Sequence, residues 1–202
     1  MSGGGAAQRR AVLLAALRLA ALFAVVFYGA DALTALRETR FQVHMAWELA
    51  MPYWPPAWLI YFSVFAVPLL PLTMLPDTQH VRRWEWRMAM AVLLAGAIFV
   101  VLPAELAYPP ADAGRWSPLA DLAQLVAGRY NLLPSLHVAL SLLTLQAVWP
   151  FAGPRVRIAL AVWYGLLVAS VLLTHQHHVA DVAAGLLLAV LIRVANARLR
   201  AR

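Results

Sequence analysis

The chain has 202 residues, 63% of them apolar, and a formal net charge of +7. A soluble globular domain is closer to half apolar, so this composition indicates an integral membrane protein in a lipid bilayer. The sequence contains no cysteine and no lysine, which excludes disulfides, thiolate nucleophiles and cysteine zinc sites. All 16 basic residues are arginines, grouped between long apolar runs. This pattern is typical of membrane topology, and no nucleic acid is expected as a partner.

Six apolar runs approach the length of about 20 residues that a helix needs to cross a bilayer. They span residues 11–30, 56–75, 88–107, 135–152, 156–174 and 179–197. The first run follows Arg9 and Arg10 and could be taken for a signal peptide, but its apolar stretch is long, which favours an uncleaved signal anchor. We therefore expect an all-α membrane protein of six transmembrane helices, with residues 1–202 forming a single membrane domain.

The arginines predict which ends of the helices face the cytoplasm. They gather at the N-terminus, between the second and third runs (Arg82, Arg83 and Arg87), between the fourth and fifth runs, and at the C-terminus. The alternate loops hold fewer arginines and most of the acidic residues. Since cytoplasmic loops carry the excess of positive charge, both termini are expected in the cytoplasm. The loop from about Tyr108 to Leu133 would then face outward.

Several ionisable residues gather at this outward face. His137 begins the fourth run, and the connection "THQHHVADVAAG" (174–185) between the last two runs contains three more histidines and Asp181. Ionisable residues at membrane depth are functional candidates. His177 and Asp181 are four residues apart and would share one helix face, whereas His178 is turned about 100° away. A carboxylate in that position can orient the imidazole and stabilise the cation that forms when the ring attacks.

The stretch "YNLLPSLHVALS" (130–141) supplies complementary groups. Pro134 suits the first position of a helix. The N–H groups of Ser135, Leu136 and His137 would then point out of the helix end, where the macrodipole favours an anion. His137 can also donate a proton to a leaving oxygen. Together the two stretches predict phosphoryl transfer through a phosphohistidine.

Both stretches resemble motifs of the type-2 phosphatidic acid phosphatase superfamily. "PSLH" (134–137) is similar to its PSGH-type second motif, and "HHVAD" (177–181) matches the HxxxD end of its third motif. The resemblance is closer to the inositol phosphorylceramide synthase-like branch, in which PSLH is followed by T-x-Q-H-x-x-x-D-x-x-x-G, as in residues 174–185 here. The stretch "MPYWPPAWLIYFSVFAVPLLPL" (51–72) also resembles that branch. The phosphatase-like core would cover roughly residues 48–190.

The resemblance implies a lipid phosphate phosphatase with His177 as nucleophile, Asp181 as its partner and His137 as acid. It implies no metal and no cofactor. The alternative is a lipid phosphotransferase that passes a phosphoryl-containing headgroup to an acceptor alcohol. The predicted topology places the reaction at the outer face, which is the periplasmic face if the protein lies in a bacterial inner membrane.

The chain departs from the superfamily at the basic residues that hold phosphate. The first motif, KxxxxxxRP, is absent, and Val171 stands where the third motif has arginine. A guanidinium can hold two phosphate oxygens, so Arg129 is the first substitute that we consider, with Arg115 and His175 behind it. The predicted substrate-binding set is Ser135, Leu136, Arg129, Asn131, His175 and Gln176.

Three other interpretations of the histidines stay open. His177 and Asp181 could form a structural pair that fixes the sixth helix. His175, His177, His178 and Asp181 could ligate zinc or iron, and the chain could be a membrane protein without enzymatic activity. The role of Glu48, which precedes the proline-rich helix start, is not predicted, and neither are the particular lipid and the oligomeric state.

Overall fold

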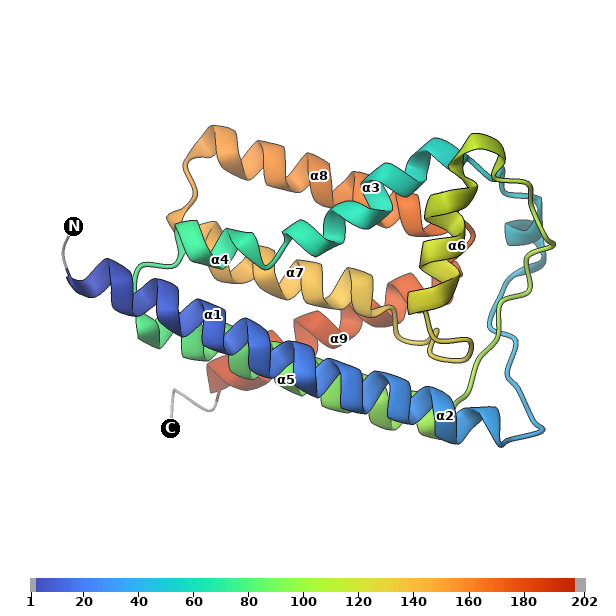
Figure 1. Ribbon diagram of the computed structural model, residues 1–202, viewed down its shortest axis with the longest axis horizontal. Coiled ribbons are helices and arrows are strands. Elements are labelled where there is room, and N and C mark those ends of the chain that lie inside the picture. The colour runs from blue at the N-terminus through green and yellow to red at the C-terminus, as the bar shows by residue number, and fades with distance from the viewer. Residues whose placement is uncertain (1–2, 199–202) are drawn as a thin grey trace.

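The computed structural model describes residues 3–198, and within this range the regular structure is helical. The isolated bridge between Phe41 and Ala104 is the one β-type pairing there. The main helices are α1 (Gly3–Phe23), α2 (Gly29–Ala35), α3 (Trp58–Phe62), α4 (Leu69–Met74), α5 (Thr78–Val101), α6 (Ser117–Val126), α7 (Leu136–Val148), α8 (Pro154–Leu173) and α9 (Val179–Arg198) (Figure 1). The all-α prediction is therefore confirmed.

Four helices are long and apolar enough to cross a membrane. They span Gly5–Ala35, Thr78–Val101, Pro154–Leu173 and Val179–Arg198. The first is continuous because a π-helical turn (Ala24–Tyr28) joins α1 to α2. The other two predicted crossings coincide with shorter apolar helices, Pro55–Ala66 and Leu136–Phe151. These long apolar helices are those of an integral membrane protein. The number of six crossings stays a prediction.

Prolines account for the broken second crossing. Pro68 lies between the 3-10 turn Ser63–Ala66 and α4, and Pro71 lies within α4. Proline lacks a backbone N–H and clashes with the preceding turn, so it interrupts a helix. α3 and α4 therefore form two short pieces in place of one long helix.

The predicted bounds of the third crossing were wrong. α5 begins at Thr78, ten residues before the predicted start, and ends at Val101. Arg82, Arg83 and Arg87 lie on this helix and not in a loop. Asp77 caps the helix, since its carboxylate accepts a hydrogen bond of 2.9 Å from the N–H of His80, and the contacts with His80 lower the pKa of Asp77. A window of apolar residues misses such polar first turns, although arginine is a good helix former.

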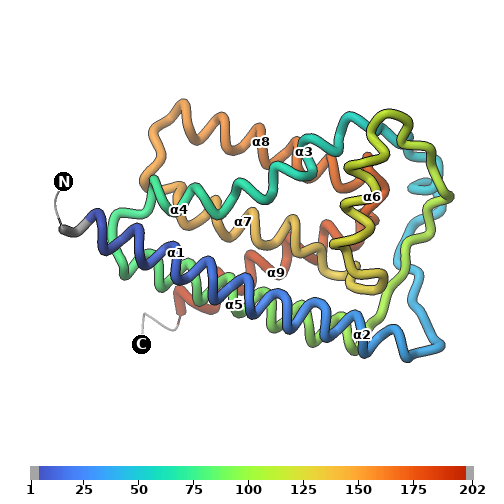
Figure 2. Tube along the Cα trace, viewed as in Figure 1, coloured from blue at the N-terminus to red at the C-terminus, as the bar shows by residue number. Residues whose placement is uncertain are grey.

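α7 lies in the middle of the bundle, with α5 beside it (Figure 1). α1 and α2 run along α5, and α7 packs against α5, α8 and α9 (Figure 1). A buried hydrogen bond of 3.0 Å from Nε1 of Trp84 to Oγ1 of Thr144 links α5 to α7. The start of α1 and the end of α9 lie at one end of the bundle, and α6 lies at the other (Figure 2). This arrangement agrees with both termini being on one side of the membrane.

Backbone hydrogen bonds fix the loops at the α6 end of the bundle, where the histidines lie. The N–H of Phe41 donates to the carbonyl of Pro103, and the N–H of Trp54 donates to the carbonyl of Leu173, each at 2.9 Å. The segment predicted as a long outward loop contains α6, a helix that was not predicted from the sequence. This end of the bundle is therefore closed by ordered connections.

Candidate functional site

The structure brings the two histidine motifs together where α9 crosses the start of α7. The N–H of Ser135 donates a hydrogen bond of 2.9 Å to the carbonyl of Asp181. One turn further along α9, a Cβ atom on Gly185 would lie 2.6 Å from the carbonyl oxygen of Ser135. Only glycine permits so close an approach of the two backbones. "PSLH" and "HHVAD" are thus fixed to each other through their backbones.

A methyl group at Gly185 should separate the motifs. We expect Gly185→Ala to lower stability by about 1–3 kcal/mol, as overpacking of a tight contact does, and to reduce any activity of the site. Thermal unfolding in detergent measures the first effect. Gly165→Ala on α8 is the matched control, because no atom lies within 4 Å of its added Cβ; equal effects of the two changes would contradict the close-contact argument.

α9 begins at Val179, and His178 is the residue that caps it. The carbonyl of His178 accepts hydrogen bonds from the N–H groups of Asp181 (3.1 Å) and Val182 (3.2 Å). The Oδ2 atom of Asp181 in turn accepts the N–H of His178 at 2.8 Å. This reciprocal pairing is half of a capping box. The prediction that His177 and Asp181 share a helix face was therefore wrong, because His177 precedes the helix.

The two side chains nevertheless meet. Nδ1 of His177 lies 3.4 Å from Oδ2 of Asp181, and both side chains are buried. This distance exceeds that of a good hydrogen bond, and neither Nδ1 of His177 nor Oδ1 of Asp181 has a hydrogen-bond partner. Catalytic contacts of this kind often tighten only when substrate is bound. Among residues 3–198, no hydrogen bond involves Nε2 of His177.

His137 faces His177 from the first turn of α7. The centroids of the two rings are 5.7 Å apart, with 67° between their planes. The ring of Tyr61, on α3, supports His137 from another side at a centroid distance of 4.6 Å. The three predicted catalytic residues, His137, His177 and Asp181, therefore lie in one cluster.

The predicted anion cradle at the start of α7 is smaller than expected. α7 begins at Leu136, with Ser135 as its N-cap, so Pro134 lies before the helix and not at its first position. The N–H of Ser135 is occupied by Asp181, and its Oγ accepts the N–H of Val138 at 3.5 Å. The N–H groups of Leu136 and His137 have no such partner within the described part of the chain, so two donors remain of the three predicted.

A buried pair beside the cluster was missed from the sequence. Oε2 of Glu48 lies 3.0 Å from Nδ1 of His178, and both side chains have no exposed surface. Oε2 also accepts the N–H of Val179 (3.1 Å), and Oε1 accepts the N–H of Met45 (3.2 Å). Glu48 thereby holds the start of α9 and the 3-10 helix Ala46–Ala50. No spacing rule predicts such a contact, because 130 residues separate the two side chains.

The hydrogen bonds of His178 define its neutral form. Its Nε2 accepts the N–H of Ala107 at 3.2 Å, so Nδ1 carries the proton that is shared with Glu48. Burial lowers the pKa of His178, although the hydrogen bond that its ring donates to Glu48 acts in the opposite direction. A neutral ring that donates to a buried carboxylate is a structural contact, and it leaves His178 unavailable as a metal ligand through Nδ1.

Tyr108 covers this group. Its ring stacks on His175 at 4.0 Å and on His178 at 4.5 Å between centroids, and its hydroxyl donates to the carbonyl of His177 at 3.4 Å. Burial, with the charges of Glu48 and Asp181, raises the pKa of Tyr108 to about 12. Tyr108 thus stays protonated at neutral pH and fixes the backbone of His177.

His175 and Gln176 lie in the turn before His177. Nε2 of His175 contacts the carbonyl of Met51 at 3.1 Å, and burial lowers the pKa of this ring. His175 has a φ of 56°, in the left-handed region that few non-glycine residues adopt. The N–H of Gln176 donates to the carbonyl of Val171 at 3.0 Å. Both residues therefore shape the turn that presents His177.

The other predicted substrate-binding residues differ in their surroundings. Asn131 is buried, and its amide donates a hydrogen bond of 2.6 Å to the carbonyl of Phe27, so it anchors the loop to the first helix. Arg129 is exposed, and no hydrogen bond or ion pair within residues 3–198 involves it. Arg115 is also exposed and lies over the ring of Trp116. Leu136 packs into the apolar core.

The metal interpretation finds no support in the arrangement. Within the described range, no three side chains of histidine, cysteine, aspartate or glutamate are placed so that they could hold one ion. His178 is directed to Glu48 and His175 to Met51, which separates the histidines that a metal site would have to combine.

These features define a helical membrane protein with a buried histidine and carboxylate cluster at one end of its bundle. A family model described as the PAP2 superfamily matches residues 32–195, which is most of the chain, and the protein belongs to this superfamily. The resemblance to type-2 phosphatidic acid phosphatases is thereby confirmed, whereas the inositol phosphorylceramide synthase-like branch is not distinguished. No match was found among curated proteins or solved structures.

Proposed function

We propose that the protein is a lipid phosphate phosphatase that acts through phospho-His177 at the outer, periplasmic face of a bacterial inner membrane. The superfamily supports a phosphatase-type enzyme, and the apolar helices support a substrate that lies in the bilayer. The observation that carries the proposal is the arrangement of His177 between Asp181, 3.4 Å from its Nδ1, and the ring of His137.

In this mechanism Nε2 of His177 attacks phosphorus, and the bond from phosphorus to the lipid oxygen breaks. His137 gives its proton to the departing oxygen, which leaves as the lipid alcohol. Asp181 stabilises the positive ring of His177 through the proton on Nδ1. Water then attacks the phosphohistidine, His137 takes a proton from that water, and inorganic phosphate leaves with His177 restored.

The phosphate would lie at the start of α7. The N–H groups of Leu136 and His137 can donate to its oxygens, and the helix end favours negative charge. Arg129 precedes this helix by a few residues, is exposed and makes no ion pair within the described chain, which supports our proposal that it contributes positive charge. The proposed binding set also includes Arg115, Asn131, His175 and Gln176.

A second candidate is transfer of the phosphoryl-containing group to an acceptor alcohol. The "PSLH" and T-x-Q-H sequences favour it, because they resemble the branch that contains inositol phosphorylceramide synthases. The first chemical step would be the same for a transferred phosphoryl group, with an alcohol replacing water in the second.

A panel of labelled lipid phosphates in nanodiscs distinguishes these functions. We expect release of free phosphate from at least one lipid, inhibition by vanadate, and no loss of activity with a metal chelator, because the proposed steps need no metal. Label that moves to an added alcohol with little free phosphate would establish the transferase instead. Activity that disappears with the chelator and returns with zinc would contradict both mechanisms.

A further inference from the structure

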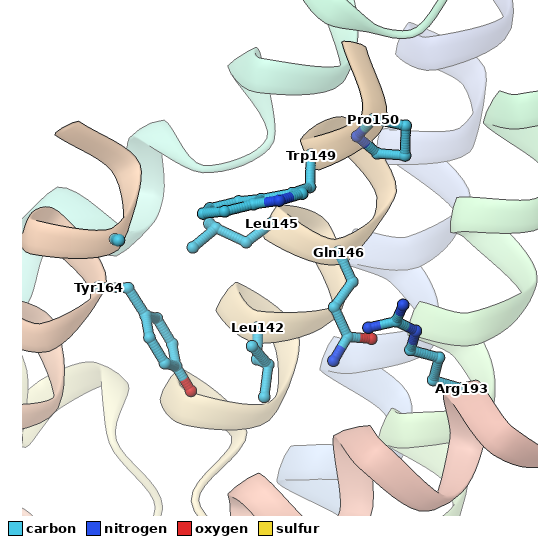
Figure 3. A pocket seen from close by; sticks show the side chains of 8 residues that line it. Leu142, Leu145, Gln146, Trp149, Pro150, Tyr164 and Arg193 are labelled. Atoms are coloured by element: carbon cyan, nitrogen blue, oxygen red, sulfur yellow. The ribbon is translucent and has the colours of Figure 1, made fainter. Parts of the chain in front are cut away.

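A cavity of about 410 Å³ lies far along α7 from the histidines, between α7, α8 and α9. It is lined by Leu142, Leu145, Gln146, Trp149, Pro150, Ala161, Tyr164 and Arg193 (Figure 3). Its size is typical of a small-molecule site. The proposed phosphatase reaction does not use it, because the cluster of His177 and Asp181 lies at the opposite end of α9.

The cavity lies toward the end of α7 that is away from the histidines. His137 is in the first turn of α7, whereas Trp149 and Pro150 follow its last turn. At about 1.5 Å per residue, the helix from Leu142 to Trp149 spans about 10 Å. From His137 to Gln146 the helix rises about 14 Å, roughly half of a hydrocarbon core of about 30 Å, so in a helix that crosses the bilayer the cavity would extend from near the middle toward the face opposite the histidines.

The lining has one polar side and one apolar side. Figure 3 shows the amide of Gln146 beside the guanidinium of Arg193, with Leu142 and Tyr164 on the other side. Oε1 of Gln146 is buried and accepts no hydrogen bond. Arg193 is exposed, and no ion pair or hydrogen bond within residues 3–198 involves it. A ligand with an anionic group and a hydrogen-bond donor could pair with both: the anion with the guanidinium of Arg193, and the donor with Oε1 of Gln146.

We propose that this cavity binds an anionic glycerophospholipid of the leaflet opposite the histidine site. Its phosphate would contact Arg193, a headgroup hydroxyl would donate to Gln146, and part of one acyl chain would lie against Leu142 and Tyr164. Basic pockets between transmembrane helices are known lipid headgroup sites. The cavity is too small for a whole phospholipid, so the remaining chain would lie along the outer surface of α8 or α9.

Trp149 supports the same occupant. Tryptophan is enriched at the membrane boundary, where its ring contacts headgroups, and Trp149, which directly follows α7, lines the cavity together with Pro150. At the inner end, the hydroxyl of Tyr164 donates to the carbonyl of Val138 at 3.2 Å. That wall is therefore held in place without a ligand.

Thermal unfolding of the delipidated protein in neutral detergent tests the site, with phosphatidylglycerol and phosphatidylcholine as probes. We expect phosphatidylglycerol to raise Tm at lower concentration than phosphatidylcholine. Loss of one guanidinium, worth about 1 kcal/mol at a membrane surface, should raise the half-saturating phosphatidylglycerol concentration about fivefold in Arg193→Gln. Leu142→Trp, which fills the cavity, should remove the effect even if Arg193→Gln folds poorly.

Arg155→Gln is the matched control, because Arg155 is an exposed arginine at the start of α8 that does not line the cavity. It should bind phosphatidylglycerol as the unchanged protein does. Equal responses to the two lipids, or an equal loss in Arg155→Gln and Arg193→Gln, would overturn the proposal and indicate diffuse surface attraction. Unchanged binding in Leu142→Trp would overturn it as well.

Discussion

Replacing His177 by asparagine should abolish turnover of the lipid phosphate and leave the protein folded. Loss of a covalent nucleophile typically reduces kcat by about four orders of magnitude or more. The fold should tolerate the change, because the ring of His177 makes no good hydrogen bond within residues 3–198 and lies before α9, not within it. Steady-state phosphate release and thermal unfolding measure the two parts of this expectation.

Trapping the intermediate makes the test specific. Rapid quenching of the unchanged protein with labelled substrate should yield acid-labile, alkali-stable label on the chain, and His177→Asn should yield none. His80→Asn is the control histidine change, since His80 is on α5 beside Phe151 and away from the cluster. Turnover that persists in His177→Asn would refute the phosphohistidine mechanism but would not affect the membership of the family.

His137 and His177 could be predicted as neighbours because two kinds of information agreed. The hydropathy pattern placed the start of the fourth run and the connection between the last two runs at the same membrane face, and short motifs marked the residues there. The sixth run was predicted to start at residue 179, where α9 does begin, but the capping contact just before it could not be predicted, and it leaves His177 outside the helix that holds Asp181. His178 makes this contact with Asp181, and the contact is visible only in three dimensions.

The remaining errors have similar physical origins. Apolar windows placed the start of the third crossing ten residues late, because the first turns of α5 are polar and extend past the apolar stretch. They also merged α3 and α4 into one predicted helix, although the helix is interrupted at Pro68. The contact between Glu48 and His178 and the cavity near Gln146 arise from segments distant in sequence, and they have no local signature.

Glu48 should be the residue outside the proposed catalytic cluster whose loss harms the protein most. Its carboxylate accepts from the ring of His178 in a fully buried contact, and from the backbone N–H groups of Met45 and Val179 in partly buried ones. Glu48→Ala would leave these donors unsatisfied, at about 1–3 kcal/mol for each buried group. We expect a loss of several kcal/mol of stability, which thermal unfolding and the yield of folded protein would show.

Glu48→Gln separates a positioning role from general stability. The amide keeps an acceptor oxygen but adds donors, so the protein should fold with a smaller loss while the turn at His177 becomes less fixed. Because Glu48 acts on His177 through His178 and the start of α9, we expect kcat to fall with little change in KM. Glu105→Gln, at a half-buried carboxylate that contacts Gln42, is the matched control. If Glu48→Gln lowered Tm but left kcat unchanged, Glu48 would stabilise this end of the bundle without positioning the proposed nucleophile.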